Sequence, residues 1–236
     1  MHTGIDFAYI EKIFPKLIQM VPFTFLIVLV SGFFGILLGV IVTVIRIKKT
    51  RMLFQIVSVY VSFTRSTPGL IQLFVVYYGL PVLLSAFGIN INQWSRTAFA
   101  ILTLILHNGA YSSEILRPAY LAVGKGQHDA ADSVGLTSTQ KLIRIIAPQM
   151  VPIALPSLAN LLMDLIKDTS LLFTIGVVDL MGRAKMIIGN DYGVGQLEVY
   201  ITIAAIYWFV SAIAEKGISE MEKRNKKFKL RSGINI

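Results

Sequence analysis

The sequence predicts an all-α membrane protein, a single domain (residues 1–236) with about five transmembrane helices, its N-terminus outside the cell and its C-terminus in the cytoplasm. Three observations lead to this fold class. Hydrophobic residues make up 55% of the chain and charged residues only 15%, which is too apolar for an ordinary soluble domain. Several apolar runs have the roughly 20 residues that a transmembrane helix needs. Basic residues gather at the ends of these runs, where they act as orientation signals.

The first segment, residues 5–20, has the pattern of an amphipathic helix. Its apolar residues are spaced as on one helical face, with charged residues between them: Ile5, Tyr9, Ile13 and Leu17. Such a helix is expected to lie on the membrane surface. The alternative is an ordinary polar segment that leads into the first transmembrane helix.

The first transmembrane helix is predicted over residues 21–45, which carry no charge. Its small residues Gly32, Gly35 and Gly39 are spaced so that another helix can approach closely. The next six residues, 46–51, contain four positive charges and are therefore expected to be cytoplasmic.

A second apolar run, residues 52–87, is longer than one transmembrane helix needs. It is interrupted at residues 64–69, where Arg65 is followed by Pro68 and Gly69. Proline removes a backbone donor and glycine loosens the chain, so we expect a broken or kinked helix there.

The remaining segments continue the alternation between membrane and loop. We expect, in order, an external loop at 88–96, a transmembrane helix at 97–120, a polar cytoplasmic segment at 121–150, a transmembrane helix at 151–178, a glycine-rich external loop at 179–198, a last transmembrane helix at 199–218 and a basic cytoplasmic tail at 216–236. This layout places 15 of the 22 Lys and Arg residues in cytoplasmic segments and 5 in external ones. The net charge of +9 is thus explained by membrane orientation and lipid contact, and no nucleic-acid partner is expected.

Two charged side chains are predicted to lie at a similar depth in the membrane. Arg65 is about 20 Å along its helix from the cytoplasmic side, and Asp168 about 24 Å. They form either an ion pair that holds the bundle together or part of a substrate site, in which Arg65 and Thr67 bind a carboxylate. Glu114 is expected to pair with Arg117 in its own helix.

A second acid extends this candidate site. Asp164 lies one helical turn before Asp168, on the same face. There it either receives a substrate ammonium group or is neutralised by Lys167 or Arg65. The candidate substrate-binding residues are Arg65, Thr67, Asn108, Ser112, Asp164 and Asp168.

Several kinds of chemistry are missing from the sequence. No G-x-x-x-x-G-K-[ST] loop is present, so the chain is not expected to bind or hydrolyse ATP by itself. With no cysteine, three scattered histidines and no H-E-x-x-H pair, no metal site is expected, and His107 is interpreted as a helix-contact residue. The G-x-S-x-G motif of serine hydrolases is also missing. We therefore expect a chain that is not an enzyme and has no cofactor of its own.

The polar segment contains small and turn-forming residues in a fixed order, namely Asp129, Ala130, Ala131, Gly135, Ile145 and Pro148. The two alanines allow a partner to approach closely, Gly135 permits a sharp turn, and Thr137 or Ser138 can cap a following helix. We expect a short helix, a turn and a second helix, with Pro148 as the residue that stops the helix.

This order resembles the cytoplasmic signature loop of permease subunits in binding-protein-dependent ABC importers. That pattern is E-A-A, three residues, G, nine residues, then I-x-L-P. Here Asp129 replaces the glutamate and Ala147 replaces the leucine. In that family the loop forms coupling helices that insert into a groove of the ATPase subunit. The resemblance therefore implies an ATPase-coupling role for Asp129, Ala130, Ala131, Gly135, Ile145 and Pro148.

Further segments resemble the polar amino-acid branch of these importers, and with the loop they extend over essentially all of residues 20–220. They are residues 65–73, 110–117, 126–127 and 167–171, with Ser66 where the branch often has Gly and Ser113 where it often has Ala. The resemblance implies an importer in a bacterial cell membrane. This chain would work with a second permease subunit, identical or paralogous, a pair of cytoplasmic ATPase subunits that bind ATP and magnesium, and an external amino-acid-binding protein.

The extra acid at Asp164 points to a substrate with an additional amino group, such as a basic amino acid or cystine. The alternative function is an ATP-independent carrier or channel that uses the intramembrane charges of Arg65, Asp164 and Asp168. That alternative does not explain the coupling loop.

Overall fold

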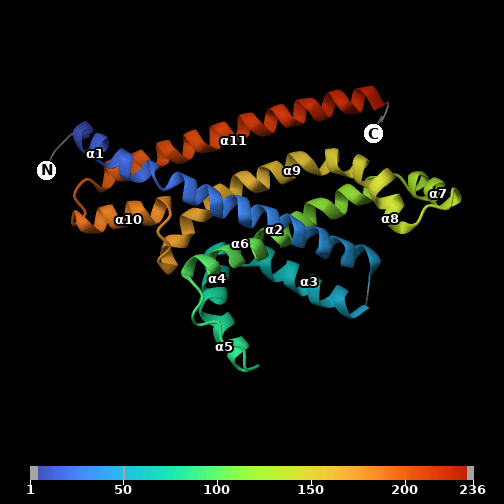
Figure 1. Cartoon of the computed structure of the whole chain (residues 1–236), viewed down its shortest axis with the longest axis horizontal. Coiled ribbons are helices and arrows are strands. Elements are labelled where there is room, and N and C mark those ends of the chain that lie inside the picture. Colours follow the sequence, from blue (N-terminus) through green and yellow to red (C-terminus); the bar gives the residue numbers. More distant parts are fainter. Residues whose placement is uncertain (1–4, 50, 233–236) are drawn as a thin grey trace.

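The computed structural model describes residues 5–49 and 51–232, and in these residues the chain is built from helices, with no strands. Figure 1 shows an elongated bundle in which α2, α6 and α9 run side by side and from which α5 projects. The helices are α1 (Phe7–Ile18), α2 (Val21–Lys48), α3 (Arg51–Ser66), α4 (Gly69–Phe74), α5 (Leu80–Ser85), α6 (Arg96–Leu121), α7 (Lys125–Ser133), α8 (Ser138–Lys141), α9 (Ala147–Asp168), α10 (Leu180–Asn190) and α11 (Gln196–Ser232). Two π-helical turns, Val75–Gly79 and Leu142–Ile146, and a 3-10 segment, Thr169–Ile175, complete the helical elements.

Helices α2 and α6 pack closely along their length because α2 presents glycines to α6. A β-carbon added at Gly35 would lie 2.7 Å from the Cβ of Asn108, and one added at Gly39 would lie 1.9 Å from the Oγ of Ser112. Asn108 and Ser112 are fully buried in this contact and donate hydrogen bonds to the carbonyls of Gly32 (3.4 Å) and Gly35 (3.3 Å). The prediction that these glycines allow a close helix contact is confirmed.

The long apolar run breaks where it was predicted to break, at Pro68 between α3 and α4. The side-chain amide of Gln72 compensates for the break, because it donates to the backbone carbonyls of Thr64 (2.8 Å) and Thr67 (2.7 Å). A buried carbonyl without a partner is unfavourable, so Gln72 stabilises the break in the apolar part of the bundle.

Contrary to the prediction, Pro148 does not stop a helix. The chain passes from α8 through the π-helical turn Leu142–Ile146 into α9, and the N–H of Ala147 bonds to the carbonyl of Leu142. The wider turn changes the hydrogen-bonding pattern, so that Pro148 falls in the first turn of α9. Pro148 has no N–H to donate, and it lies just after the π-helical turn, where the usual i to i−4 bonding is already interrupted.

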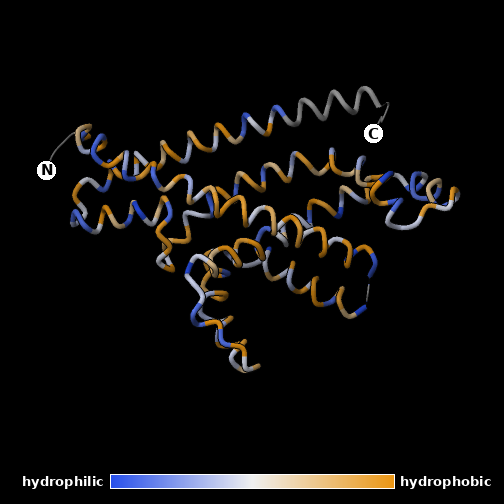
Figure 2. The backbone as a smooth tube through the Cα atoms, in the orientation of Figure 1, coloured by the Kyte–Doolittle hydropathy of each residue, from blue (hydrophilic) through white to orange (hydrophobic). Residues whose placement is uncertain are grey.

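Three helical stretches of the described residues are long and apolar enough to cross a membrane, namely Val21–Lys48, Ser138–Ile175 and Gln196–Glu220. A shorter apolar stretch is Gly69–Ser85. Large apolar side chains face outward on the bundle, such as Phe33 (67% exposed) and Trp208 (73% exposed). In Figure 2, hydrophobic residues follow these helices and hydrophilic residues gather around α7. An apolar outer surface is what contact with lipid requires, and the chain is a multi-pass membrane protein.

Helix α10 occupies part of the segment that was expected to be an external loop. Asp179 caps this helix by accepting a hydrogen bond from the N–H of Gly182 (2.9 Å). Leu180, Ala184 and Ile187 recur on one helical face and are buried in a cluster with residues of α1 and α11. The helical spacing of these apolar residues outweighs the glycine content on which the loop prediction was based.

Helix α1 lies within the stretch where an amphipathic helix was expected. Its residues Ile13 (1% exposed) and Leu17 (fully buried) contact α10 and α11. The inner part of its apolar face is therefore covered by protein, while Phe7 and Phe14 remain exposed.

Candidate functional site

Helix α6 carries a polar stripe on its accessible face. His107, Tyr111 and Glu114 follow one another at helical spacing, and each is half-buried. Asn108 and Ser112, which were selected from the sequence as substrate-binding residues, are fully buried against α2. The structure therefore divides the polar residues of α6 between a packing face and an accessible face.

Arg65 pairs with this stripe, whereas the sequence had offered Asp168 as its partner. The Nη1 of Arg65 lies 2.5 Å from one carboxylate oxygen of Glu114, and the other oxygen pairs with Arg46. The reason is that α3 packs on α6, so that the last turn of α3 reaches Glu114. The expected local pair between Glu114 and Arg117 is replaced by these contacts from two other helices.

The cluster around Glu114 has an excess of positive charge. One carboxylate faces two guanidinium groups, and the side chain of Arg65 is 53% exposed. Because a guanidinium group has five N–H donors, Arg65 can bind a second carboxylate while it holds Glu114. A cleft of about 380 Å³ between α6 and α9 opens beside Glu114 and is lined also by Pro118 and Ser157.

The two acids of α9 have different partners. Asp164 lies 2.7 Å from Lys167, and both side chains are more than 60% exposed, at 63% and 62%. Of the two possibilities for Asp164, neutralisation by Lys167 is the one that the structure contains. The carboxylate of Asp168 instead faces His107, with 3.8 Å between Oδ2 and Nε2.

Gln72 connects this acid to the break between α3 and α4. Its Oε1 lies 3.0 Å from the Nδ1 of His107, while its Nε2 holds the carbonyls at the break. A cavity of about 20 Å³, lined by residues of α4, α6, α9 and the 3-10 segment, lies beside His107 and Asp168. Gln72 was not selected from the sequence. The signal that could have found it is an amide in an otherwise apolar run just after Pro68, because a buried amide needs polar partners.

The polar segment folds into the predicted short helix, turn and second helix. Gly135 has a φ of +73°, and its N–H bonds to the carbonyl of Asp132 (3.0 Å) at the end of α7. Thr137 caps α8 and forms a reciprocal capping box with Gln140. Lys141 bonds to both carboxylate oxygens of Asp132, at 2.7 and 2.8 Å, so α7 and α8 are held together.

Exposed apolar side chains mark the outer surface of this segment. Val134 is 74% exposed and Ile143 is 64% exposed, and Ala130 is also exposed. Ala131 is only 4% exposed, so the two alanines do not face a partner together as the sequence had indicated. Of the other predicted coupling residues, Ile145 is half-buried, and the exposed ones are Asp129, Gly135 and Pro148. Exposed apolar groups on a polar segment are typical of a docking surface.

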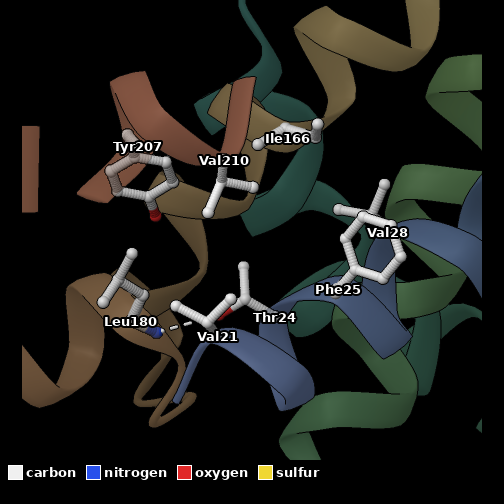
Figure 3. A pocket seen from close by; sticks show the side chains of 8 residues that line it. All are labelled: Val21, Thr24, Phe25, Val28, Ile166, Leu180, Tyr207 and Val210. Carbon is white, nitrogen blue, oxygen red and sulfur yellow. Dashed lines mark hydrogen bonds between the residues drawn. The ribbon is translucent and has the colours of Figure 1, made fainter. Parts of the chain in front are cut away.

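A cavity near α10, at the other end of the bundle, is too small for a ligand. It has about 10 Å³, which is at the lower limit for one water molecule, and Figure 3 shows mostly apolar side chains around it. The Oγ1 of Thr24 accepts a hydrogen bond from the N–H of Leu180 there (3.1 Å). The adjacent Asp179 is fully buried, and burial raises the pKa of its carboxyl group to about 6, against the opposing effect of backbone hydrogen bonds.

Comparison with known proteins gives a match over most of the chain. Residues 33–216 match the family described as "Binding-protein-dependent transport system inner membrane component". The L-cystine transport system permease protein TcyL of Bacillus subtilis (strain 168) is 37% identical over 227 residues, which cover 96% of this chain and 94% of TcyL. The probable amino-acid ABC transporter permease protein PatM of Vibrio harveyi is 39% identical over 210 residues, covering 89% of this chain and 92% of PatM.

Solved structures share the architecture. A chain from a structure described as "Crystal structure of an amino acid ABC transporter with histidines" has a TM-score of 0.80 at 30% identity, covering 94% of this chain and 100% of that chain. A chain of the MetNI methionine ABC transporter in an inward-facing conformation has a TM-score of 0.69 at 21% identity, covering 89% of this chain and 95% of that chain. The second likeness is one of fold alone.

Proposed function

The chain belongs to the family of inner membrane components of binding-protein-dependent transport systems, and we propose that it is the permease subunit of an ATP-driven amino-acid importer in a bacterial cell membrane. The observation that carries this proposal is the near full-length similarity to amino-acid permeases, 37% over 227 residues in the case of TcyL. The proposed topology has five transmembrane helices, with the N-terminus outside and the C-terminus in the cytoplasm. The distribution of basic residues supports it.

The substrate path in this proposal follows the accessible stripe of α6. Asp168 near His107 and Arg65 beside Glu114 supply charges of opposite sign along the same helix. An amino acid carries an ammonium and a carboxylate group, and these two charges suit its two ends.

Other polar residues support this path or narrow the choice of substrate. Thr67 lies at the helix break, where its carbonyl accepts a hydrogen bond from Gln72, while Asn108 and Ser112 fix α6 against α2 from behind. Asp164 lies on the face of Asp168 and is paired with Lys167. In this proposal the extra ammonium group of a basic amino acid or cystine replaces Lys167 at this carboxylate. Transport of L-cystine by TcyL agrees with this choice.

Coupling to ATP hydrolysis is assigned to residues 121–150. Ala130, Val134 and Ile143 would enter a groove of the ATPase subunit, since they are exposed and apolar or small. The αL turn at Gly135 and the bond between Lys141 and Asp132 hold α7 and α8 in one arrangement. A segment held in this way can pass on a displacement that a flexible loop would absorb.

The working importer needs further chains. We propose a pair of cytoplasmic ATPase subunits that bind ATP and magnesium, a second permease subunit and an external amino-acid-binding protein. In this arrangement the chain has no catalytic role and binds no cofactor itself.

Reconstitution tests this function. The chain is co-expressed with the candidate ATPase and binding protein, and uptake of radiolabelled cystine, lysine, arginine and glutamine is measured in proteoliposomes. We expect the ATPase to co-purify with this chain, and uptake to require both ATP inside the vesicles and the binding protein. Equal uptake with and without ATP would instead support an ATP-independent carrier.

A further inference from the structure

The hydrogen bonds of Gln72 fix the direction in which its side-chain amide points. Its Nε2 lies 2.8 Å from the carbonyl of Thr64 and 2.7 Å from that of Thr67, and both carbonyls only accept hydrogen bonds. The amide nitrogen must therefore face these carbonyls, and the amide oxygen must face His107. Since this oxygen also only accepts, the Nδ1 of His107, 3.0 Å away, must carry a proton.

The other ring nitrogen of His107 faces the carboxyl group of Asp168, at 3.8 Å. A neutral histidine has a proton on one ring nitrogen only, and Gln72 requires that proton on Nδ1. The Nε2 would then direct a lone pair toward a carboxylate in a half-buried site. Two acceptors that face each other without a donor are unfavourable away from bulk water. One added proton, on Nε2 or on the carboxyl group, turns this contact into an attraction.

The charged groups around the pair already have partners of their own. On α9, Lys167 is bonded to Asp164 at 2.7 Å. On α3, Arg65 is bonded to Glu114. The ring of Tyr111, on α6, lies against the ring of His107 with 4.7 Å between centroids. Neither α4 nor the 3-10 segment contains a charged residue, so a proton is the simplest way to satisfy the contact.

We propose that Gln72, His107 and Asp168 form a proton-binding site within the transmembrane part of the chain. Gln72 is the positioning residue that holds the ring of His107 as a donor on Nδ1. His107 and Asp168 share one proton taken up from water, and in a coupled pair this proton belongs to both groups. The adjoining cavity of about 20 Å³ has room for a water molecule through which the proton can pass.

The site has a consequence for a cationic substrate. An ammonium group that approaches Asp168 offers the same positive charge as the bound proton, so substrate and proton compete for this carboxylate. This consequence rests on the proposed function, whereas the proton site does not, because it follows from contacts within the chain alone.

Magnetic resonance of the full-length chain in lipid vesicles tests the site without any need for transport. Histidine is labelled with ¹⁵N in the ring and aspartate with ¹³C at the carboxyl carbon. The chain has three histidines, so replacing His2 and His128 by Asn leaves His107 as its only ring signal. In the parent chain, His128 of α7 serves as the internal comparison.

At pH 7 we expect His107 to carry a proton on Nδ1. We also expect one further proton, either on Nε2 of His107 or on the carboxyl group of Asp168, whose signal is identified by its absence in Asp168→Asn. In Asp168→Asn the further proton should be lost, because the new amide can donate to Nε2. In Gln72→Leu the ring is free to change tautomer, and a neutral ring with its proton on Nε2 is expected.

Two results would overturn the proposal. The first is a neutral ring beside an ionised Asp168 at pH 7 in the parent chain, as when a water molecule donates to both groups. The second is an unprotonated Nδ1, which would remove the role of Gln72. The variants serve to assign the His107 and Asp168 signals, and both points are then read from the assigned signals of the parent chain.

Discussion

Single glycines decide how closely α2 and α6 pack. A methyl group at Gly39 of α2 would lie 1.9 Å from the Oγ of Ser112 in α6. It would also lie 3.1 Å from the backbone carbonyl oxygen of Gly109 in α6. We expect Gly39→Ala to lower the free energy of unfolding by about 1–3 kcal/mol, because an overpacked helix contact must separate. Denaturant unfolding in detergent micelles measures this change.

A matched control is available on another part of the chain. At Gly79 an added β-carbon meets nothing within 4 Å. Gly79→Ala should therefore not lower the stability, because it creates no clash and alanine is the better helix former. Adding Ser112→Ala to Gly39→Ala should recover part of the loss, since it removes the nearest atom. Equal stability of the Gly39→Ala and Gly79→Ala variants would show that the contact tolerates a larger residue.

The two acids of α9 should differ in their effect on transport. The charge of Asp164 is paired with Lys167, whereas Asp168 faces the stripe of α6. We expect Asp168→Asn to raise the half-saturation concentration for a cationic amino acid by about tenfold or more, which corresponds to one lost charge-assisted hydrogen bond of about 1.5–3 kcal/mol. Asp164→Asn should raise it by less, about threefold. Uptake in proteoliposomes gives both values, and a larger effect of Asp164→Asn would reverse the assignment.

At the scale of helices, the sequence was sufficient for the position of α6 and the break at Pro68, but not for helix α10, the continuous helix at Pro148 or the rotation of α6. The extent of helix α6, the break at Pro68 and the turn at Gly135 were all predicted, because each depends on local residues. Which face of α6 is accessible was not predictable, since Asn108 and His107 are adjacent and both polar. Their roles depend on where the glycines of α2 lie in space.

The turn at Gly135 allows a test of the coupling segment that separates backbone strain from crowding. Its φ is +73°, and an added β-carbon would meet nothing within 4 Å. Gly135→Val should disturb the turn, because left-handed backbone costs a residue with a β-carbon about 1–2 kcal/mol. Gly135→Asn adds a side chain of similar size but tolerates this conformation.

The measurement is the ATPase activity of the purified complex with loaded binding protein. We expect Gly135→Val to reduce the stimulated activity by about fivefold or more, in line with a strain of about 1–2 kcal/mol, and Gly135→Asn to retain most of it. Equal loss in both variants would mean that side-chain bulk matters here and backbone strain does not.

At the scale of the whole molecule, contacts between distant segments were the part that the sequence could not supply. Glu114 was expected to pair with Arg117 in its own helix, yet it joins Arg46 of α2 and Arg65 of α3. The segment of α10 was expected to be a loop because it is rich in glycine, and the apolar partners that make it a helix, such as Ile13 and Leu17, are more than 160 residues away in the chain. Such pairings follow from the packing of the complete bundle.

Asp179 connects several parts of the bundle, so its ionisation should affect the stability of the whole molecule. It caps α10, which packs on α1 and α11, and the N–H of the next residue, Leu180, bonds to Thr24 of α2. Burial raises the pKa of Asp179 from 3.8 to about 6. The folded chain therefore holds this proton more tightly than the unfolded chain does.

The direction of the pH effect follows from this difference. The stabilisation by protonated Asp179 is complete below about pH 4, is lost as the pH rises toward about 6, and does not change further above that value. Two pKa units correspond to about 3 kcal/mol. We expect the thermal midpoint of the parent chain to decrease as the pH is raised from 4 to 6. The part of this decrease that comes from Asp179 should be missing in Asp179→Asn. The Asn side chain can still accept the capping hydrogen bond.

Other groups titrate in the same range, so the comparison between variants isolates Asp179. The difference in thermal midpoint between Asp179→Asn and the parent should therefore grow from pH 4 to pH 6 and then remain constant. A difference that is the same at every pH would place the titrating group elsewhere and leave Asp179 with only its capping role. A pH-dependent difference would mean that one buried carboxyl group, at the end of the bundle opposite α7, adjusts the stability of helices that cross the whole structure.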